Sequence, residues 1–317
     1  MIKFYKKENG NLIVSDQIGA AGWIHISPPF SHAELEALAT ELVIPLDFLT
    51  DSLDIDERSR YEKEEEDRLI VLNTPILNDG DDVNDAIYVT VPIGIILTGQ
   101  YILTITPKEN PVLNIFLEDS LKNFNPHNVS LFILQIMEQN VFRFLTCLKQ
   151  LNLKRNIIEK ELYDSSRNKE LRQLLSIEKS LVYFVNTLSS NELLKMKMKR
   201  TDLLRIKDDE ALTDLFEDII IDNSQALEMS NVYTNILNGT MEAYASIISN
   251  NLNVVIQRLT LITIILMVPT LVASFYGMNV PVPFKSDDSP ETFFYILIFS
   301  LVISILLALW FRRKRLF

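Results

Sequence analysis

The sequence predicts an α+β/α membrane protein, with an α/β domain, a long helical stalk and two C-terminal transmembrane helices. Residues 1–126 hold eight prolines and six glycines, whereas residues 127–268 hold one glycine and no proline. Two runs without charged residues follow, at 259–284 and 292–311. Strands and turns are therefore expected in the first stretch, uninterrupted helices in the second and membrane spans in the third.

The formal net charge of −12 is unevenly distributed along the chain. The last 59 residues contain three acids and five bases, a net charge of +2, so the preceding residues carry −14. Phosphate backbones repel a body of that charge, which argues against nucleic acid as a partner. One cysteine and three histidines are too few for a disulfide framework or a soft-metal cage. Oxygen ligands are therefore expected to bind any metal.

The first stretch alternates strand and helix patterns. Residues 22–26 are typical of a strand, and Ser31 with Glu34 forms a capping box that begins a helix. A short helix is expected over 45–53. The stretch 57–68, with six acids and four bases, is interpreted as a solvated face. Three further runs have the composition of strands: 69–76, 86–97 and 101–106.

The second stretch predicts helices over roughly 128–198 and then one very long helix from about residue 211. Apolar residues recur there at steps of 3, 4 or 7 and so keep one face. They are Leu212, Phe216, Ile219, Ala226, Tyr233, Leu237, Tyr244, Ile248 and Val255. If it continues to Tyr276, this helix is roughly 100 Å long at 1.5 Å per residue. A helix of that length needs packing partners along much of its course.

The third stretch predicts a membrane hairpin, because each charge-free run reaches the length of about 20 residues that a span requires. The basic residues 312–315 directly follow the second run, so the positive-inside rule places both termini in the cytoplasm. A buried core hairpin is the alternative. The expected organisation is an α/β domain at 1–126, a helical region and stalk at 127–258, a first span at 259–279, an outer loop at 280–291, a second span at 292–311 and a basic tail at 312–317.

Two helices cannot enclose a pore, so a pore requires several copies around an axis. The first span carries a stripe of small or non-aliphatic residues with steps of 3 and 4. The stripe consists of Thr260, Thr263, Met267, Thr270, Ser274 and Gly277. It either faces water or lets neighbouring helices pack closely. The second span has only Ser300 and Ser304 among its aliphatic residues and is interpreted as lipid-facing.

The first span ends in the sequence Tyr276-Gly277-Met278-Asn279. With this signature between two C-terminal spans, the chain resembles the CorA-type divalent cation channels over essentially its whole length. The run Trp-Ile-His-Ile at 23–26 and the stretch 48–62 are also similar to that family. The resemblance implies a homopentamer with a cytoplasmic funnel that takes up Mg²⁺ across the cell (inner) membrane.

The resemblance implies a selectivity filter at Gly277, Met278 and Asn279. Mg²⁺ sheds its waters reluctantly, so a ring of amide and carbonyl oxygens is suited to grip the hydrated ion. The expected pore-lining residues are Asn253, Thr263, Met267, Thr270 and Ser274. Rings of Ile256, Leu259 and Met267 are expected to form an apolar gate that dewets when closed. Ordinary helix packing is the alternative for these apolar positions.

The resemblance also implies that cytoplasmic Mg²⁺ closes the channel by binding between neighbouring subunits. The matching positions are Asp51 and Asp218. A divalent ion between two carboxylates cancels their repulsion and favours the arrangement that brings subunits together. Mg²⁺ is thus expected both as the transported ion and as a regulator.

The leading functional hypothesis is a passive Mg²⁺ channel and not an enzyme, because no catalytic constellation stands out. Alternatives are transport of Co²⁺, Ni²⁺ or Zn²⁺ on the same scaffold, and a membrane-anchored sensor that does not conduct. The chain departs from the family pattern at Ser274, at Val280 and in the loop 281–285. These departures concern ion preference at the outer mouth.

Overall fold

The computed structural model describes residues 1–8, 10–15, 22–80, 85–99, 101–121, 124–164, 168–278 and 290–314. Its contacts divide the chain into two compact units, Met1–Thr240 and Met241–Phe317. The helix α6 (Glu210–Tyr276) begins in the first unit and ends in the second.

The first unit contains a seven-stranded sheet with the order β2-β1-β3-β7-β6-β5-β4. Strands β3 and β7 pair in parallel, and the other neighbours pair antiparallel. The strands are β1 (Ile2–Glu8), β2 (Asn11–Ser15), β3 (Trp23–Ile26), β4 (Arg60–Glu64), β5 (Asp67–Leu77), β6 (Tyr88–Thr98) and β7 (Tyr101–Ile105).

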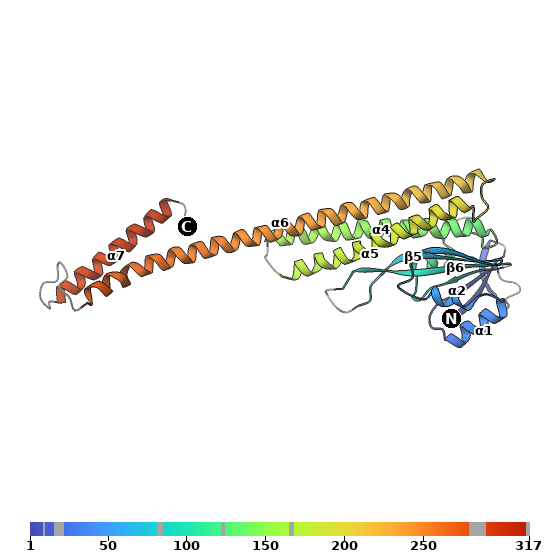
Figure 1. Cartoon of the computed structure of the whole chain (residues 1–317), viewed down its shortest axis with the longest axis horizontal. Helices are drawn as coiled ribbons and strands as arrows, with labels where there is room; N and C mark the ends of the chain where they lie inside the picture. The colour runs from blue at the N-terminus through green and yellow to red at the C-terminus, as the bar shows by residue number, and fades with distance from the viewer. Residues whose placement is uncertain are drawn as a thin grey trace. The chain divides into compact units, whose positions relative to one another are not determined.

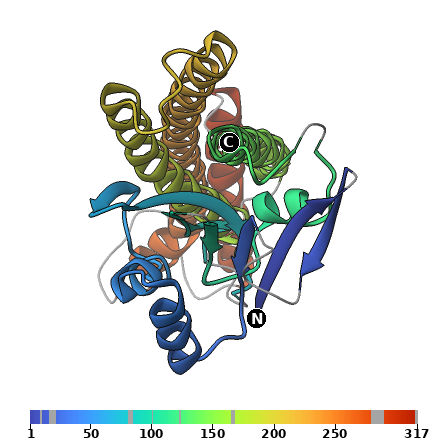
Figure 2. The ribbon, with the colours of Figure 1, turned by 90° about the vertical axis from the view of Figure 1, so that its right-hand side faces the viewer.

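Helices cover both faces of this sheet (Figures 1 and 2). On one face lie α1 (His32–Leu42) and α2 (Leu46–Asp51), which pack on Leu69, Val71 and Ile96. The other face packs on three helices: α3 (Pro111–Leu117), α4 (Val129–Asp164) and α5 (Asn168–Thr201), together with the first turns of α6. Alternate residues of β5 and β6 therefore enter different cores, which explains the nearly continuous apolar runs of these two strands.

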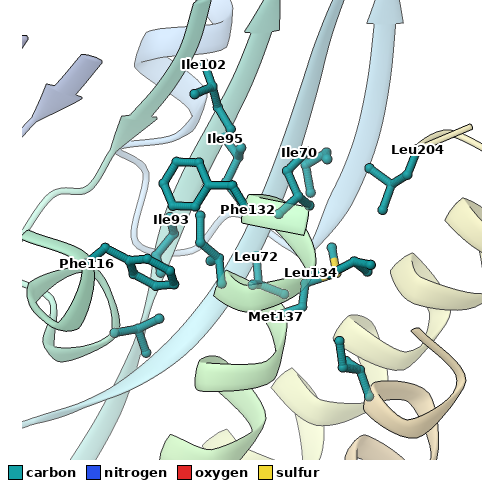
Figure 3. Close-up of a cluster of buried hydrophobic side chains, with 14 of the residues drawn as sticks. Ile70, Leu72, Ile93, Ile95, Ile102, Phe116, Phe132, Leu134, Met137 and Leu204 are labelled. Atoms are coloured by element: carbon teal, nitrogen blue, oxygen red, sulfur yellow. The ribbon is translucent and has the colours of Figure 1, made fainter. Parts of the chain in front are cut away.

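The larger core lies between the sheet and α3–α6 (Figure 3). Ile70, Leu72, Ile93 and Ile95 project from the sheet toward Phe132 of α4. Trp23, another member of this core, is fully buried. Its ring stacks on Tyr5 and meets the edges of Phe124 and Phe132, while its Nε1 donates to Thr104 Oγ1 at 2.9 Å.

A layer of buried polar groups joins β5, α4 and α5. Asn140 Nδ2 and Asn191 Nδ2 both donate to the carbonyl oxygen of Asn73, each at 2.9 Å. Ser59 Oγ donates to Asn191 Oδ1 at 2.6 Å. These bonds satisfy side chains that would be costly to bury alone, and they set the register of the helices on the sheet.

A buried lysine joins α5 to α6. Lys195 is fully buried, and its Nζ donates to Asn223 Oδ1 at 2.7 Å, while Asn223 Nδ2 donates to the carbonyl of Leu188 at 3.1 Å. Burial lowers the pKa of Lys195 to about 7, and the negative charge of Glu192 opposes that effect. An ammonium group has three N–H donors, whereas a neutral amine has fewer donors to satisfy. Burial of Lys195 beside Asn223 Oδ1 therefore favours the neutral amine.

Most sequence-based expectations for the first unit are confirmed. The strand at 23–26, the Ser31–Glu34 capping box, the short helix α2 and the long helices all occur. Strands β1 and β2 were not predicted. The charged stretch 57–68 is also more structured than expected, because its middle forms β4, a strand at the edge of the sheet. Exposed charges on an edge strand are common, since they discourage further strand pairing.

The second unit is built from the last part of α6 and from α7 (Pro290–Arg313) (Figure 1). Three described helices are long and apolar enough to cross a membrane: α4, α6 and α7. The apolar window of α4 is 61% buried, against 6% for α6 and 11% for α7. The apolar window of α4 therefore belongs to the core of the first unit, whereas the apolar windows of α6 and α7 are left for a membrane or for other copies of the chain.

Candidate functional site

The last part of α6 has two distinct faces. Leu261 is buried, and Ile265, Val268, Val272 and Tyr276 are partly covered. The predicted polar stripe from Thr260 to Gly277 is exposed at every one of its positions. Because successive residues of an α-helix are about 100° apart, the covered set and the stripe lie on opposite sides of α6.

Helix α7 covers the first of these faces. Ser304 Oγ lies 3.4 Å from the carbonyl oxygen of Ile265 and 2.9 Å from that of Ser300. Pro269 lies inside α6 and has no N–H to donate to the carbonyl four residues earlier, which is that of Ile265. Ser304 has one hydroxyl proton, and its Oγ lies closer to the Ser300 carbonyl than to the Ile265 carbonyl that Pro269 leaves open. The proton is therefore shared between the two carbonyls, with the Ile265 carbonyl as the longer contact.

This contact corrects the interpretation of the second span as simply lipid-facing. Ser300 and Ser304 are buried, whereas most aliphatic and aromatic residues of α7 are exposed. The two serines form the face of α7 that packs on α6, and the remaining faces are free for lipid.

The threonines of the exposed stripe donate their hydroxyl protons to backbone carbonyls of α6. Thr260, Thr263 and Thr270 each donate to the carbonyl four residues earlier, at 2.9, 2.9 and 3.2 Å. Each oxygen then presents its lone pairs outward as an acceptor. The waters around a cation point their protons away from the ion, so this row of acceptors is suited to a hydrated cation.

The expected gate residues lie on the same side of α6. Ile256, Leu259 and Met267 are all exposed, at 52%, 64% and 59%, and Asn253 is also exposed. Ile256 precedes Thr260 by four residues and Thr263 by seven, so it continues the stripe toward the N-terminus of α6.

The signature begins where α6 ends. Gly277 N donates to the carbonyl of Ala273 at 2.9 Å, and Met278 N donates to that of Phe275 at 3.3 Å. Both residues are exposed. Asn279, whose side-chain amide is expected in the selectivity filter, lies outside the described residues, as do the loop residues 280–289.

The two expected regulatory acids lie in the first unit on different layers. Asp51 is the last residue of α2, which packs on one face of the sheet. Asp218 is exposed on α6, between Phe216 and Ile219, which pack on the other face. One protomer therefore does not bring these two carboxylates together. An ion that touches both must lie between copies.

Asp51 is already paired within its own protomer. Arg60 Nη2 lies 2.7 Å from Asp51 Oδ2. Burial raises the pKa of the Asp51 carboxyl, the charge of Arg60 opposes this, and Glu57, Asp47 and Glu62 add to the rise. Within the described ranges, no group of three or more His, Cys, Asp or Glu residues could hold a metal ion.

Comparisons with known proteins agree with this architecture. A family model described as "CorA-like Mg2+ transporter protein" matches residues 19–313. The chain belongs to the CorA family. A curated CorA relative is the cobalt/magnesium transport protein CorA of Methanocaldococcus jannaschii, 25% identical over 298 residues, which cover 92% of this chain and 90% of the relative.

Solved structures of a CorA transporter and of two other proteins share the fold. The complete CorA magnesium transporter of Methanocaldococcus jannaschii matches with a TM-score of 0.82 at 22% identity, covering 99% of this chain and 98% of that one. The full-length CmaX protein matches with a TM-score of 0.65 at 16% identity, covering 99% and 97%. The ZntB cytoplasmic domain from Vibrio parahaemolyticus matches with a TM-score of 0.60 at 10% identity, covering 78% and 98%.

Three features of this CorA protein escaped the sequence reasoning. Arg60 belongs to the stretch interpreted as a solvated face, and Ser304 belongs to the span interpreted as lipid-facing. Lys195 has no sequence signal that separates it from the other lysines of the predicted helices. The lone proline of α6 was a usable signal for Ser304, because an orphaned carbonyl predicts a hydroxyl on the neighbouring helix. Lys195 depends on its contact with Asn223, 28 residues away, and Arg60 depends on the fold that brings the start of β4 to the end of α2.

Proposed function

We propose that this CorA protein is a Mg²⁺ channel that mediates passive uptake across the cell membrane as a homopentamer. The observation that supports this most is the threonine stripe on α6, which faces away from α7 and presents oxygen acceptors. Copies arranged around an axis on that side would surround a path lined with such acceptors. We assign the first span to 259–279 and the second to 292–311, with both termini in the cytoplasm.

The filter of the proposed pore consists of Gly277, Met278 and Asn279, with Asn253, Thr263, Met267, Thr270 and Ser274 lining the path. Amide and carbonyl oxygens would hold the hydrated ion without charged protein groups, so that binding stays weak enough for release. Ile256, Leu259 and Met267 would close the path by dewetting. A dication moving down a potential of 100 mV gains about 4.6 kcal/mol, which is sufficient to drive uptake.

Regulation in this proposal comes from Mg²⁺ bound between Asp51 of one copy and Asp218 of the next. The position of the two acids on opposite layers of one protomer supports a site between copies. Bound Mg²⁺ would favour the closed arrangement, because it cancels the repulsion of the two carboxylates only when the copies are close.

The test of function is uptake into liposomes that contain the purified full-length protein and a Mg²⁺-sensitive dye. We expect Mg²⁺ to enter when the interior is made negative, and to enter more slowly when the interior is positive. Entry of Co²⁺, Ni²⁺ or Zn²⁺ without Mg²⁺ would favour the first alternative. If no cation enters, the non-conducting sensor is the better account.

Neutralising the regulatory acids should relieve inhibition. For the double variant Asp51→Asn with Asp218→Asn, we expect the internal Mg²⁺ concentration for half-inhibition to rise at least tenfold in patch recordings, because the bridging ion loses both carboxylates. The matched control is Asp54→Asn with Asp214→Asn, which removes exposed acids from the same segments. Inhibition that is unchanged in the first pair would reject Asp51 and Asp218 as sensors.

A further inference from the structure

Arg60 holds three carboxylates with its three guanidinium nitrogens. Nη2 lies 2.7 Å from Asp51 Oδ2, Nε lies 2.8 Å from Glu57 Oε1, and Nη1 pairs with Glu62 Oε2. Charge-assisted bonds of this kind are the strong ones among surface hydrogen bonds. Arg60 is thus surrounded by carboxylates, and one of these is the proposed sensor Asp51.

Both partners of the Arg60–Asp51 pair are anchored by backbone structure. Arg60 is the first residue of β4 and lies opposite Val71 of β5. Asp51 ends α2, which is held on the sheet by the buried side chains of Phe48 and Leu49. The two charges therefore meet without the ordering of a long flexible loop, which lowers the entropic cost of the pair.

A divalent cation at Asp51 would meet this guanidinium. The carboxyl group is partly desolvated, and the charge of Arg60 favours its ionised form. A dication that binds the same carboxylate either displaces the guanidinium or is repelled by it. On displacement, Arg60 keeps Glu57 and Glu62 as partners, so the released cation is not left unpaired.

We propose that Arg60 is a built-in competitor for the divalent cation at Asp51 and so sets the Mg²⁺ concentration at which the channel closes. This inference rests on the proposed regulatory role of Asp51. Without Arg60, Asp51, Glu57 and Glu62 would attract Mg²⁺ more strongly, and the channel would close at lower concentrations. Because the pair is partly exposed, the effect is modest, about three- to tenfold.

The test measures cation binding and transport on the purified full-length protein. Mn²⁺ is titrated as a probe and followed by electron paramagnetic resonance. We expect Arg60→Gln to lower the apparent Kd for Mn²⁺ about three- to tenfold, and Arg60→Gln with Asp51→Asn to lose that gain. The matched control is Arg58→Gln, which removes the same charge from an exposed residue two positions earlier and should leave the Kd near wild type.

In Mg²⁺ uptake, Arg60→Gln should lower the half-inhibiting internal Mg²⁺ concentration by the same factor. The inference is overturned if Arg60→Gln binds Mn²⁺ as wild type does, if Arg58→Gln gains equally, or if the gain survives Asp51→Asn. A gain in binding with unchanged inhibition overturns the regulatory role of Arg60. Failure of wild-type uptake would overturn the proposed channel instead, and the Mn²⁺ titration would still decide whether Arg60 competes with a cation.

Discussion

The free energy of unfolding of this CorA protein is expected to rise by about 4 kcal/mol between pH 7 and pH 10.5 because of Lys195 alone. Burial lowers the pKa of this lysine from 10.5 to about 7 in the folded chain. Between these values the unfolded chain carries a proton on Lys195 that the folded chain lacks, so stability increases with pH. A difference of one in pKa corresponds to about 1.4 kcal/mol, and full burial leaves little solvent screening.

The measurement is the melting temperature of the full-length protein in detergent from pH 6.5 to pH 9.5, for wild type and for Lys195→Met. The melting temperature of wild type should rise with pH relative to that of the variant. For a unit of this size, each kcal/mol in the free energy of unfolding corresponds to roughly 2–4 °C in melting temperature. The matched control is Lys199→Met, an exposed lysine of the same helix that pairs with Glu217, which should follow wild type. A parallel pH dependence in Lys195→Met would contradict a neutral lysine between α5 and α6.

Replacing Gly94 with alanine is expected to destabilise the first unit by about 3 kcal/mol, at the upper end of overpacking effects. A Cβ at this position of β6 would lie 2.0 Å from Ser52 Oγ and 2.3 Å from Ser52 Cβ. Ser52 is fully buried and donates to the carbonyl of Phe48 at 2.7 Å, so it cannot move aside. Helix α2, which carries Asp51, would be pushed off the sheet.

Thermal unfolding of the full-length protein checks this expectation. Gly99→Ala is the matched control, because its added Cβ would meet nothing within 4 Å. Its melting temperature should stay near that of wild type. Adding Ser52→Gly to Gly94→Ala should recover part of the loss, although Ile105 Cγ2 would still lie 2.8 Å from the new Cβ. Equal melting temperatures for the two alanine variants would show that α2 is not tightly packed on β6.

The order of elements was largely predictable, because prolines, glycines and apolar periodicity are local signals. The 142 residues from 127 to 268 contain one glycine and no proline, and they form α4, α5 and most of α6. The edge strands were less predictable. Strand β4 has exposed charged residues instead of an alternating apolar pattern, so only its pairing with β5 makes it a strand. Tertiary context decides such segments.

In the candidate site too, features that depend on local sequence were predictable, and features that depend on tertiary contacts were not. The stripe on α6 was recognisable in the sequence because its members share one helix, and all six of them are exposed. The contacts that modify the site were not predictable, because each joins two different elements that only the folded chain brings together. Arg60 reaches Asp51 only through the position of β4 against α2. Ser304 meets the Ile265 carbonyl across the hairpin, 39 residues away.

In the proposed channel the threonine stripe of α6 lines the ion path, and cysteine accessibility in reconstituted liposomes is the measurement that tests this. The single native cysteine, Cys147, is buried, and burial raises its pKa to about 11, so it should not react. Cysteine is placed at Thr263 or Thr270 on the stripe, and at Val272 as the control, because Val272 belongs to the partly covered set on the opposite side of α6. A cationic, membrane-impermeant thiol reagent is then added while Mg²⁺ uptake is recorded.

We expect the reagent to reduce uptake at least tenfold in Thr270→Cys, and also in Thr263→Cys if the reagent reaches that depth. Wild type and Val272→Cys should continue to take up Mg²⁺. Uptake that persists in Thr270→Cys but is lost in Val272→Cys would place the ion path on another face of α6 and contradict a path along the stripe.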